Sequence, residues 1–235
     1  MWVARQAAVN GSCSLRAAPD DETRRVTVDD RLPPGQIQTT KWPVLHYGDV
    51  PTVDTSKWTF MVSGLVERPF SLSYDELLAL PRKTVVCDIH CVTTWSRLDN
   101  TFEGVPVQAL LERAGLKPAA KFCLVVAEQG FTTNLPLSDL NRPENLIALT
   151  WAGEWLTPEH GWPARLLVPH LYFWKSAKWV RGFELLDDDL PGFWEQNGYH
   201  MHGDPWTEER YGGRGLTQHE INKFRNASKK LGGRS

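Results

Sequence analysis

The chain has 235 residues, of which 41% are hydrophobic and 23% charged, a balance typical of a globular protein with a buried core. Its 26 Lys and Arg against 28 Asp and Glu give a formal net charge of -2, so no global basic field favours nucleic-acid binding. No apolar run approaches the roughly 18 residues that a membrane span requires, which argues against a membrane protein.

The two ends of the chain differ in composition from its middle. Residues 1–31 are polar and lack the apolar stretch of a secretory signal, and Arg24-Arg25 is not followed by a hydrophobic segment. We therefore expect a cytoplasmic protein. The end of the chain is rich in Lys and Arg. These patterns predict a polar leader over residues 1–31, one main domain over residues 32–211 and a solvated basic tail over residues 212–235.

The pattern along the main domain predicts short strands with few, brief helices. Apolar or alternating segments predict strands over residues 58–66, 84–89, 122–127, 146–151, 165–168 and 180–186. A capping box at Ser73 and Glu76 begins a short helix that Pro81 stops, and a second short helix begins near Pro106 and ends before Gly115. Helices do not alternate regularly with strands. This favours an α+β fold with mixed β-sheets over a doubly wound sheet.

Two residue types stand out as candidates for a site. The 11 Trp provide large, rigid side chains that suit the walls of a pocket, although they also suit an ordinary core. The four cysteines, Cys13, Cys87, Cys91 and Cys123, are too few and too irregularly spaced for a disulfide scaffold, so we expect reduced thiols.

Cys91 lies at or just past the end of the predicted strand over residues 84–89, where sites often form. It could fill the core, act as a nucleophile beside a histidine from elsewhere in the chain, or serve as a soft thiolate ligand for a metal held by a cofactor. Structural zinc is disfavoured, because Cys87 and Cys91 are too far apart on a strand for ready chelation and His90 points away from Cys91.

A group of cations lies between His160 and Lys178. His160, Arg165, Lys175 and Lys178 are flanked by Trp and Gly, and such donors can hold a phosphate through charge-assisted hydrogen bonds. The alternative is a set of solvated cations on a surface loop. The residues alone leave both open.

Several segments together resemble a known family. Cys91 within residues 88–96, the segments 160–165 and 176–179, and the segments 192–199 and 203–206 are similar, in order and in spacing, to the molybdopterin-binding domain of the sulfite oxidase family. The similarity runs from about Leu32 to Tyr211 and is greatest to short bacterial sulfite-oxidase-like oxidoreductases. It implies the fold of that domain, with mixed sheets and short helices.

The resemblance also implies roles for individual residues. Cys91 matches the thiolate ligand of a mononuclear molybdenum, and Tyr199 and Arg97 fall near the residues that orient the substrate's oxygen. The implied contacts to the pterin cofactor and its phosphate are His46, Glu128, His160, Arg165, Ser176, Ala177 and Lys178. A second substrate arginine has no clear counterpart, Lys41 being the nearest cation, and this puts sulfite in doubt as the substrate.

These implications predict a Mo-molybdopterin enzyme, with tungsten as a possible replacement for molybdenum. The expected reaction is two-electron oxygen-atom transfer on a small substrate. Because no Cys-x-x-Cys-His haem signature is present, we expect electrons to pass to an external flavin reductase, haem protein or iron–sulfur protein. The alternatives are a non-catalytic pterin-binding module and a cofactor-free thiol enzyme using Cys91. His200 and His202 lack evident further ligands for a second metal.

Overall fold

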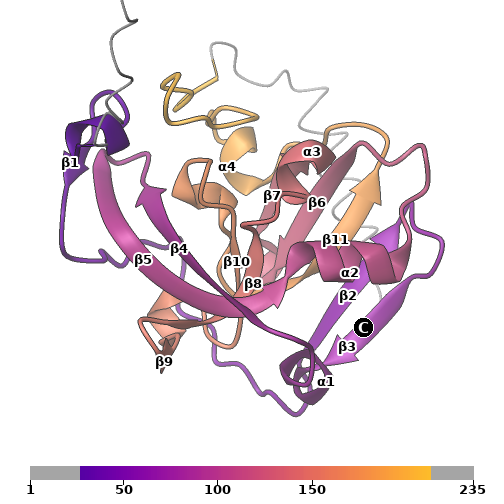
Figure 1. Cartoon of the computed structure of the whole chain (residues 1–235). Coiled ribbons are helices and arrows are strands. Elements are labelled where there is room, and N and C mark those ends of the chain that lie inside the picture. The colour runs from indigo at the N-terminus through magenta and orange to yellow at the C-terminus, as the bar shows by residue number, and fades with distance from the viewer. Residues whose placement is uncertain (1–26, 213–235) are drawn as a thin grey trace, which may run out of the picture.

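The computed structural model describes residues 27–212, which fold around two β-sheets and a few short helices (Figure 1). This confirms the predicted α+β class with mixed sheets. The leader prediction for residues 1–26 and the tail prediction for residues 213–235 lie outside the described residues. No described helix is long and apolar enough to cross a membrane.

The first sheet has six strands and contains the predicted strand that leads to Cys91. Its main path runs β1-β5-β8-β10, with β4 paired to β5 and β9 paired to β8. The bounds are β1 Ile37–Gln38, β4 Lys83–His90, β5 Trp95–Pro106, β8 Leu146–Trp151, β9 Glu154–Trp155 and β10 Arg165–Leu167. β1 runs parallel to β5, whereas the other pairs are antiparallel. β4 and β5 thus form a hairpin whose turn carries Cys91.

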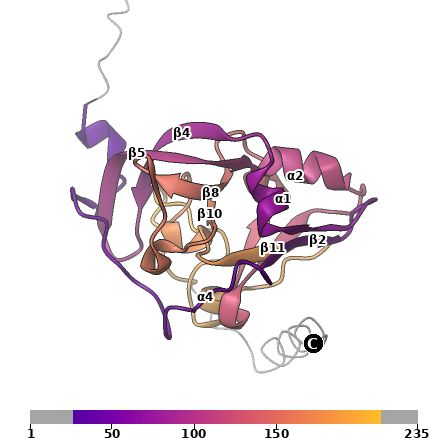
Figure 2. The same cartoon turned by 90° about the horizontal axis from the view of Figure 1, so that it is seen from below.

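The second sheet has five strands in the order β3-β2-β11-β6-β7. Its strands are β2 Thr59–Gly64, β3 Phe70–Ser73, β6 Phe122–Ala127, β7 Thr132–Pro136 and β11 Val180–Leu186. β11 pairs with β2 in parallel and with β6 antiparallel, so this sheet is mixed as well. In both views α2, residues Val107–Ala114, and α1, residues Tyr74–Leu78, lie near the β2 side of this sheet (Figure 2).

Both predicted helices form where their end signals place them. Ser73 caps α1: its hydroxyl accepts the Glu76 N–H, while the Glu76 carboxylate accepts the Ser73 N–H. α2 ends at Gly115, whose φ of 67° lies in the region that glycine adopts without strain. The remaining short elements are α3 Leu137–Leu140, α4 Phe193–Gln196 and the 3₁₀ turns Asp29–Arg31, Glu128–Gly130, Pro158–His160 and Phe173–Lys175.

The two-residue period of β8 divides the core into two clusters. Ile147 and Leu149 point into a large cluster shared with the second sheet, and Leu146 and Ala148 point into a smaller cluster that contains Phe102. β8 is therefore buried on both faces. The segments that follow β4 and β10 carry the residues described next.

Candidate functional site

One cavity of about 450 Å³ opens where the Cys91 turn meets several loops. It is lined by segments 42–48, 91–95, 128–131, 173–179 and 193–199 together with Arg165. This volume is within the range of ordinary cofactor and ligand sites.

Cys91 lies on the cavity wall in a tight turn between β4 and β5, with 8% of its surface exposed. The turn is closed by the Cys91 N–H, which donates to the Trp95 carbonyl at 2.8 Å, and by the Thr94 N–H, which donates to the Cys91 carbonyl at 3.0 Å. The sulfur contacts the hydroxyl of Thr93 at 3.1 Å. Burial raises the pKa of the Cys91 thiol, although the hydrogen bonds to Thr93 and the charge of Arg210 oppose this.

Two distant side chains hold the carbonyls of this turn. Gln36 Nε2 donates to the Cys91 carbonyl at 3.0 Å, and Arg210 Nη1 donates to the Val92 carbonyl at 2.6 Å. Gln36 is itself held, because the Ser96 hydroxyl donates to its Oε1 at 3.2 Å. The turn that presents the thiol is thus fixed from both ends of the described chain.

No histidine among the described residues hydrogen-bonds the Cys91 sulfur. His90, its neighbour, is buried and bonds Ser96 Oγ at 2.8 Å, and burial lowers the pKa of His90 to about 4. A cofactor-free thiol enzyme needs a basic group in contact with its nucleophile. The geometry does not provide one here.

Arg165, at the start of β10, is a buried cation without a carboxylate partner among residues 27–212. Its Nη1 and Nη2 donate to the carbonyls of His160 and Ser176, each at 2.8 Å, whereas its Nε has no partner. The guanidinium lies 4.3 Å from the centre of the Phe173 ring. Burial lowers the pKa of Arg165 to about 9. A charge in this position is costly unless an anion compensates it.

Lys178 adds a second cation to the same wall. Its ammonium donates to the Glu159 carbonyl at 2.6 Å and forms no described ion pair with a carboxylate. Burial, together with the charge of Arg165, lowers the pKa of Lys178 to about 7. Gly161, with a φ of 110°, permits this packing, because a Cβ there would lie 3.1 Å from the Cβ atoms of Arg165 and Lys178. Two uncompensated cations and an unpartnered buried N–H fit the phosphate of a pterin cofactor.

Tyr199 belongs to an aromatic wall that lies beside Cys91. Its ring stacks on Trp194 with centroids 4.9 Å apart and meets the edge of Trp174 at 5.1 Å. Burial raises the pKa of Tyr199, with further contributions from Tyr211 and Cys91, so the phenol stays protonated at neutral pH. Among the described residues its hydroxyl forms no hydrogen bond, which leaves a donor available to a ligand.

The structure places eight of the ten predicted site residues on the cavity: Cys91, Tyr199, His46, Glu128, Arg165, Ser176, Ala177 and Lys178. Their roles stay predictions. Within this set, His46 Nδ1 bonds the Gly48 carbonyl at 2.8 Å, and Glu128 pairs with Arg181 at 2.6 Å.

The structure does not bring Arg97 and His160 to the cavity wall. Arg97 donates to the Thr40 carbonyl at 3.2 Å and to Asn100 Oδ1, and it stacks over Trp151 at 4.7 Å. These contacts direct it away from Cys91. His160 stacks on Trp42 with ring centroids 4.1 Å apart and reaches Arg165 only through its carbonyl. A role for His160 would thus be to position Arg165.

Lys175, grouped with the phosphate-binding cations from the sequence, has a different place. It is fully buried, pairs with Glu195 at 2.7 Å, and donates to the Asn134 and Met201 carbonyls at 3.0 and 2.6 Å. Glu195 also accepts the Trp174 indole N–H at 2.8 Å. The pair therefore supports the aromatic wall from behind and does not reach the cavity.

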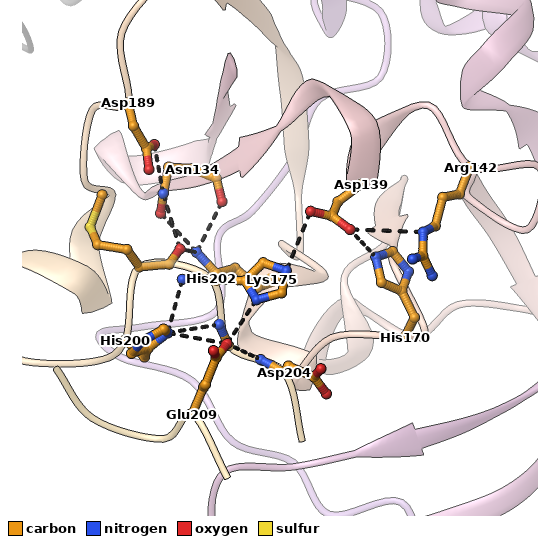
Figure 3. A network of polar contacts seen from close by, with 12 residues as sticks. Asn134, Asp139, Arg142, His170, Lys175, Asp189, His200, His202, Asp204 and Glu209 are labelled. Carbon is orange, nitrogen blue, oxygen red and sulfur yellow. Dashed lines mark hydrogen bonds and ion pairs between the residues drawn. The ribbon is translucent and has the colours of Figure 1, made fainter. Parts of the chain in front are cut away.

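His200 and His202 are joined to carboxylates in a chain of polar contacts (Figure 3). His202 lies between Asp139 and Glu209, with Nε2 3.4 Å from one carboxylate and Nδ1 2.7 Å from the other. His170 binds the second oxygen of Asp139 at 3.0 Å. Residues 27–212 contain no cluster of three or more His, Cys, Asp or Glu suited to a metal ion. In the structure these histidines contact carboxylates.

Sequence reasoning missed Gln36 and Arg210, and it did not identify the individual members of the aromatic wall. The high Trp content was the signal for the wall, since Trp42, Trp95, Trp174, Trp179 and Trp194 all line the cavity. No sequence signal marked Gln36 or Arg210, because both act on main-chain carbonyls far away in the sequence.

This two-sheet α+β domain has a buried thiol and two cations without carboxylate partners among the described residues on one cavity, an arrangement suited to an anionic cofactor. The family model described as the oxidoreductase molybdopterin binding domain matches residues 47–194, and the chain belongs to this family. It is a molybdenum-dependent oxidoreductase whose cofactor is Mo-molybdopterin, as the sequence resemblance predicted.

Individual relatives agree with this assignment. The chain is 51% identical over 191 residues to the uncharacterized oxidoreductase YuiH of Bacillus subtilis (strain 168), covering 81% of this chain and 96% of that protein. It is 29% identical to the protein-methionine-sulfoxide reductase catalytic subunit MsrP of Gluconobacter oxydans (strain 621H), covering 59% of this chain and 50% of MsrP.

A solved structure shows the same fold. The sulfane dehydrogenase SoxCD from Paracoccus pantotrophus superposes with a TM-score of 0.57 at 25% identity, covering 62% of this chain and 42% of that chain. The chain thus spans half of MsrP and less than half of the SoxCD chain.

Proposed function

We propose that the chain catalyses two-electron oxygen-atom transfer on a small substrate, with Cys91 as the protein ligand of the molybdenum. The observation that carries this proposal is that the Cys91 thiol lines the same cavity as Arg165 and Lys178, two cations without a carboxylate partner among residues 27–212. A soft thiolate suits a metal that cycles between oxidation states. A module that only stored the pterin would not need such a thiol.

Four residues would hold the cofactor and position its protein ligand. Arg165 and Lys178 would neutralise the pterin phosphate, and Gln36 and Arg210 would hold the Cys91 turn in one geometry. Tyr199 would donate a hydrogen bond to the oxygen of the substrate, where a preorganised donor lowers the barrier. When bound, the cofactor supplies the two-electron redox chemistry.

The electrons are proposed to pass to and from an external carrier protein. The description of the relative MsrP as a catalytic subunit supports this, since it implies a second component. A flavin reductase, a haem protein or an iron–sulfur protein would serve. We also propose a cytoplasmic location. The described cysteines Cys87, Cys91 and Cys123, which are all free, are compatible with it.

Replacing the proposed ligand tests the function. Cys91→Ala is expected to lower turnover per protein by at least about a hundredfold, since even outer-shell changes at metal sites cost 10- to 100-fold. Turnover is measured on purified protein from a host that makes molybdopterin, with reduced viologen against sulfoxides and N-oxides and with ferricyanide against sulfite. Molybdenum and pterin contents are measured alongside.

Cys87→Ala is the matched control. Cys87 lies on β4, four residues away, and does not line the cavity. The Cys87→Ala variant is expected to keep full turnover. Full turnover in Cys91→Ala would exclude Cys91 as the ligand.

A further inference from the structure

One loop near the end of the described chain has its two ends side by side. Tyr199 and Tyr211, its first and last residues, form an antiparallel bridge, and the His200 N–H donates to the Arg210 carbonyl at 3.2 Å. Tyr199 lines the cavity, and Arg210 holds the carbonyl of Val92. The fold of the Tyr199–Tyr211 loop therefore sets the positions of two side chains at the site.

The first half of this loop is bound to the rest of the domain. The Met201 carbonyl accepts a hydrogen bond from Lys175 Nζ at 2.6 Å, and the Gly203 carbonyl accepts the Tyr172 N–H at 2.8 Å. A Cβ at Gly203 would lie 2.7 Å from the Trp174 ring, so this half packs tightly against the aromatic wall of the cavity. The first half is therefore a fixed support for the second.

The carboxylate of Glu209 joins the second half of the loop to the first (Figure 3). Its Oε2 accepts the Asp204 N–H at 2.9 Å and lies 2.7 Å from His202 Nδ1 and 3.3 Å from His200 Nδ1. Burial alone would raise the pKa of Glu209, but the hydrogen bonds from Asp204 and His202 outweigh burial and lower this pKa. The carboxylate is therefore ionised at neutral pH, the state in which it is the stronger acceptor.

Arg210 follows Glu209 directly, so the backbone at Glu209 sets where the guanidinium lies. Arg210 Nη1 donates to the Val92 carbonyl at 2.6 Å, and Nη2 donates to the Pro34 carbonyl at 3.3 Å. The guanidinium also lies 5.0 Å from the centre of the Tyr172 ring. If the second half of the loop shifted, the Val92 carbonyl would lose this donor.

We propose that Glu209 is a positioning residue for the site. By closing the loop, its carboxylate keeps Arg210 on the Val92 carbonyl, which holds the Cys91 turn in one geometry, and it keeps Tyr199 at the cavity. Glu209 does not itself line the cavity, so it acts through these neighbours. Its effect on turnover rests on the proposed function, whereas its effect on the turn does not.

The test measures opening of the Cys91 turn in the cofactor-free chain, by hydrogen–deuterium exchange of peptides that cover residues 91–95. The N–H groups of Cys91 and Thr94 are hydrogen-bonded within the turn, so their exchange reports its opening. Glu209→Ala is expected to speed this exchange by about tenfold or more, the change in population that loss of one charge-assisted hydrogen bond produces. Peptides that cover β8 are the internal reference and should exchange as in the parent.

Two conservative variants separate the hydrogen-bonding oxygen from the length of the side chain. Glu209→Gln keeps an oxygen that can accept the Asp204 N–H, and its exchange is expected to stay within about threefold of the parent. Glu209→Asp keeps the charge but shortens the side chain. It is expected to speed the exchange of the turn, and it decides the point if Glu209→Ala does not fold. On the molybdenum-loaded protein, turnover per molybdenum should fall in the variants that open the turn and be retained in Glu209→Gln.

Glu76→Ala is the matched control. The Glu76 carboxylate also accepts an N–H, that of Ser73 at 2.7 Å, but it caps α1 and lies outside the cavity lining. This variant is expected to lower the temperature of thermal unfolding. Exchange of residues 91–95 and turnover per molybdenum should stay at the parent's values.

The outcomes separate this inference from the proposed function. Unchanged exchange of the turn in Glu209→Ala and Glu209→Asp, or an equal increase in the turn and in β8, would overturn the inference. Exchange in Glu209→Gln as fast as in Glu209→Ala would also overturn it, because the hydrogen-bonding oxygen would then not hold the turn. A loaded parent protein that turns over no compound would contradict the proposed function, and exchange in the cofactor-free chain would still decide the inference.

Discussion

At the scale of single residues, Arg165 depends most strongly on what fills the cavity. It is 1% exposed, its Nε has no partner, and burial already lowers its pKa to about 9. Few proteins keep an arginine so deeply buried without a carboxylate. The free-energy cost of burying this charge is therefore offset only when an anion lies beside the guanidinium.

Arg165→Met tests this point, because it removes the charge and keeps an unbranched apolar stem. We expect pterin per protein to fall roughly tenfold or more, which corresponds to the loss of one charge-assisted hydrogen bond. Pterin is measured by the fluorescence of its oxidised form. Arg113→Met removes a guanidinium that stacks on Phe70 outside the cavity and should retain normal pterin content. Equal contents in both variants would place the phosphate elsewhere.

At the scale of elements, the β4–β5 hairpin presents Cys91, but its turn depends on partners outside the hairpin. Gln36 holds the Cys91 carbonyl, and Gln36 is followed directly by β1, which pairs in parallel with the start of β5. β1 thus positions Gln36, and Gln36 in turn holds the Cys91 turn. A strand of only two residues therefore contributes to the geometry of the site.

Gln36→Leu is expected to lower the free energy of unfolding by about 1 to 2 kcal/mol and to lower turnover per bound molybdenum, because the Cys91 carbonyl loses one of its two hydrogen-bond donors. Urea unfolding and metal-normalised turnover measure the two effects. Gln108→Leu is the control, since Gln108 donates to the Asn141 carbonyl at 3.0 Å and lies outside the cavity lining. Equal turnover per molybdenum in both variants would show that the turn holds its geometry without Gln36.

Hydrophobic pattern predicted six of the eleven described strands, and β5, the longest strand, is among those it missed. Two inward positions of β5 are polar: Ser96 and Asn100 are fully buried. They are satisfied by hydrogen bonds, such as that from Asn100 Nδ2 to the Cys87 carbonyl at 3.2 Å. A pattern of apolar residues indicates which side chains leave water on folding. It does not indicate which polar side chains are buried, because their hydrogen-bond partners come together only in the folded state.

At the scale of the whole molecule, the polar chain of Figure 3 joins the C-terminal segment to α3. Asp139 is shared by His170 and His202, and Glu209 is shared by His200 and His202. Burial alone would raise the pKa of Asp139. The hydrogen bond from His170 and the charges of nearby His and Arg side chains outweigh burial and lower this pKa. A carboxylate whose pKa is lowered by folding stabilises the fold at pH values above its ordinary pKa. This stabilisation is lost as the pH falls through the pKa of the folded state.

Asp139→Asn is therefore expected to destabilise the protein at pH 7 and to reduce the loss of stability that occurs below about pH 4. Thermal unfolding across pH 3 to 7 measures both. The control Asp75→Asn changes an exposed carboxylate in the first turn of α1 and should leave the acid profile nearly unchanged. Parallel acid profiles for Asp139→Asn and the parent would show that Asp139 does not contribute.

Eight of the ten site residues predicted from the sequence line the cavity, because the segments that carry them keep the family's order and spacing. Arg97 and His160 are not among the lining residues, because spacing along the chain does not tell which way a side chain turns. Arg97 packs on Trp151 and bonds Asn100, and His160 packs on Trp42. Gln36 and Arg210 act across more than 50 residues, which no local pattern encodes.

The clamp on the Cys91 turn also has a consequence for biosynthesis. Arg210, which holds the Val92 carbonyl, comes after every strand of residues 27–212. The ribosome synthesises all strands of both sheets before it synthesises Arg210, so until then the Cys91 turn lacks one of its supports. Cofactor insertion into a finished site must then follow synthesis of this last segment, and a chain truncated before Arg210 would keep its sheets but accept the cofactor poorly.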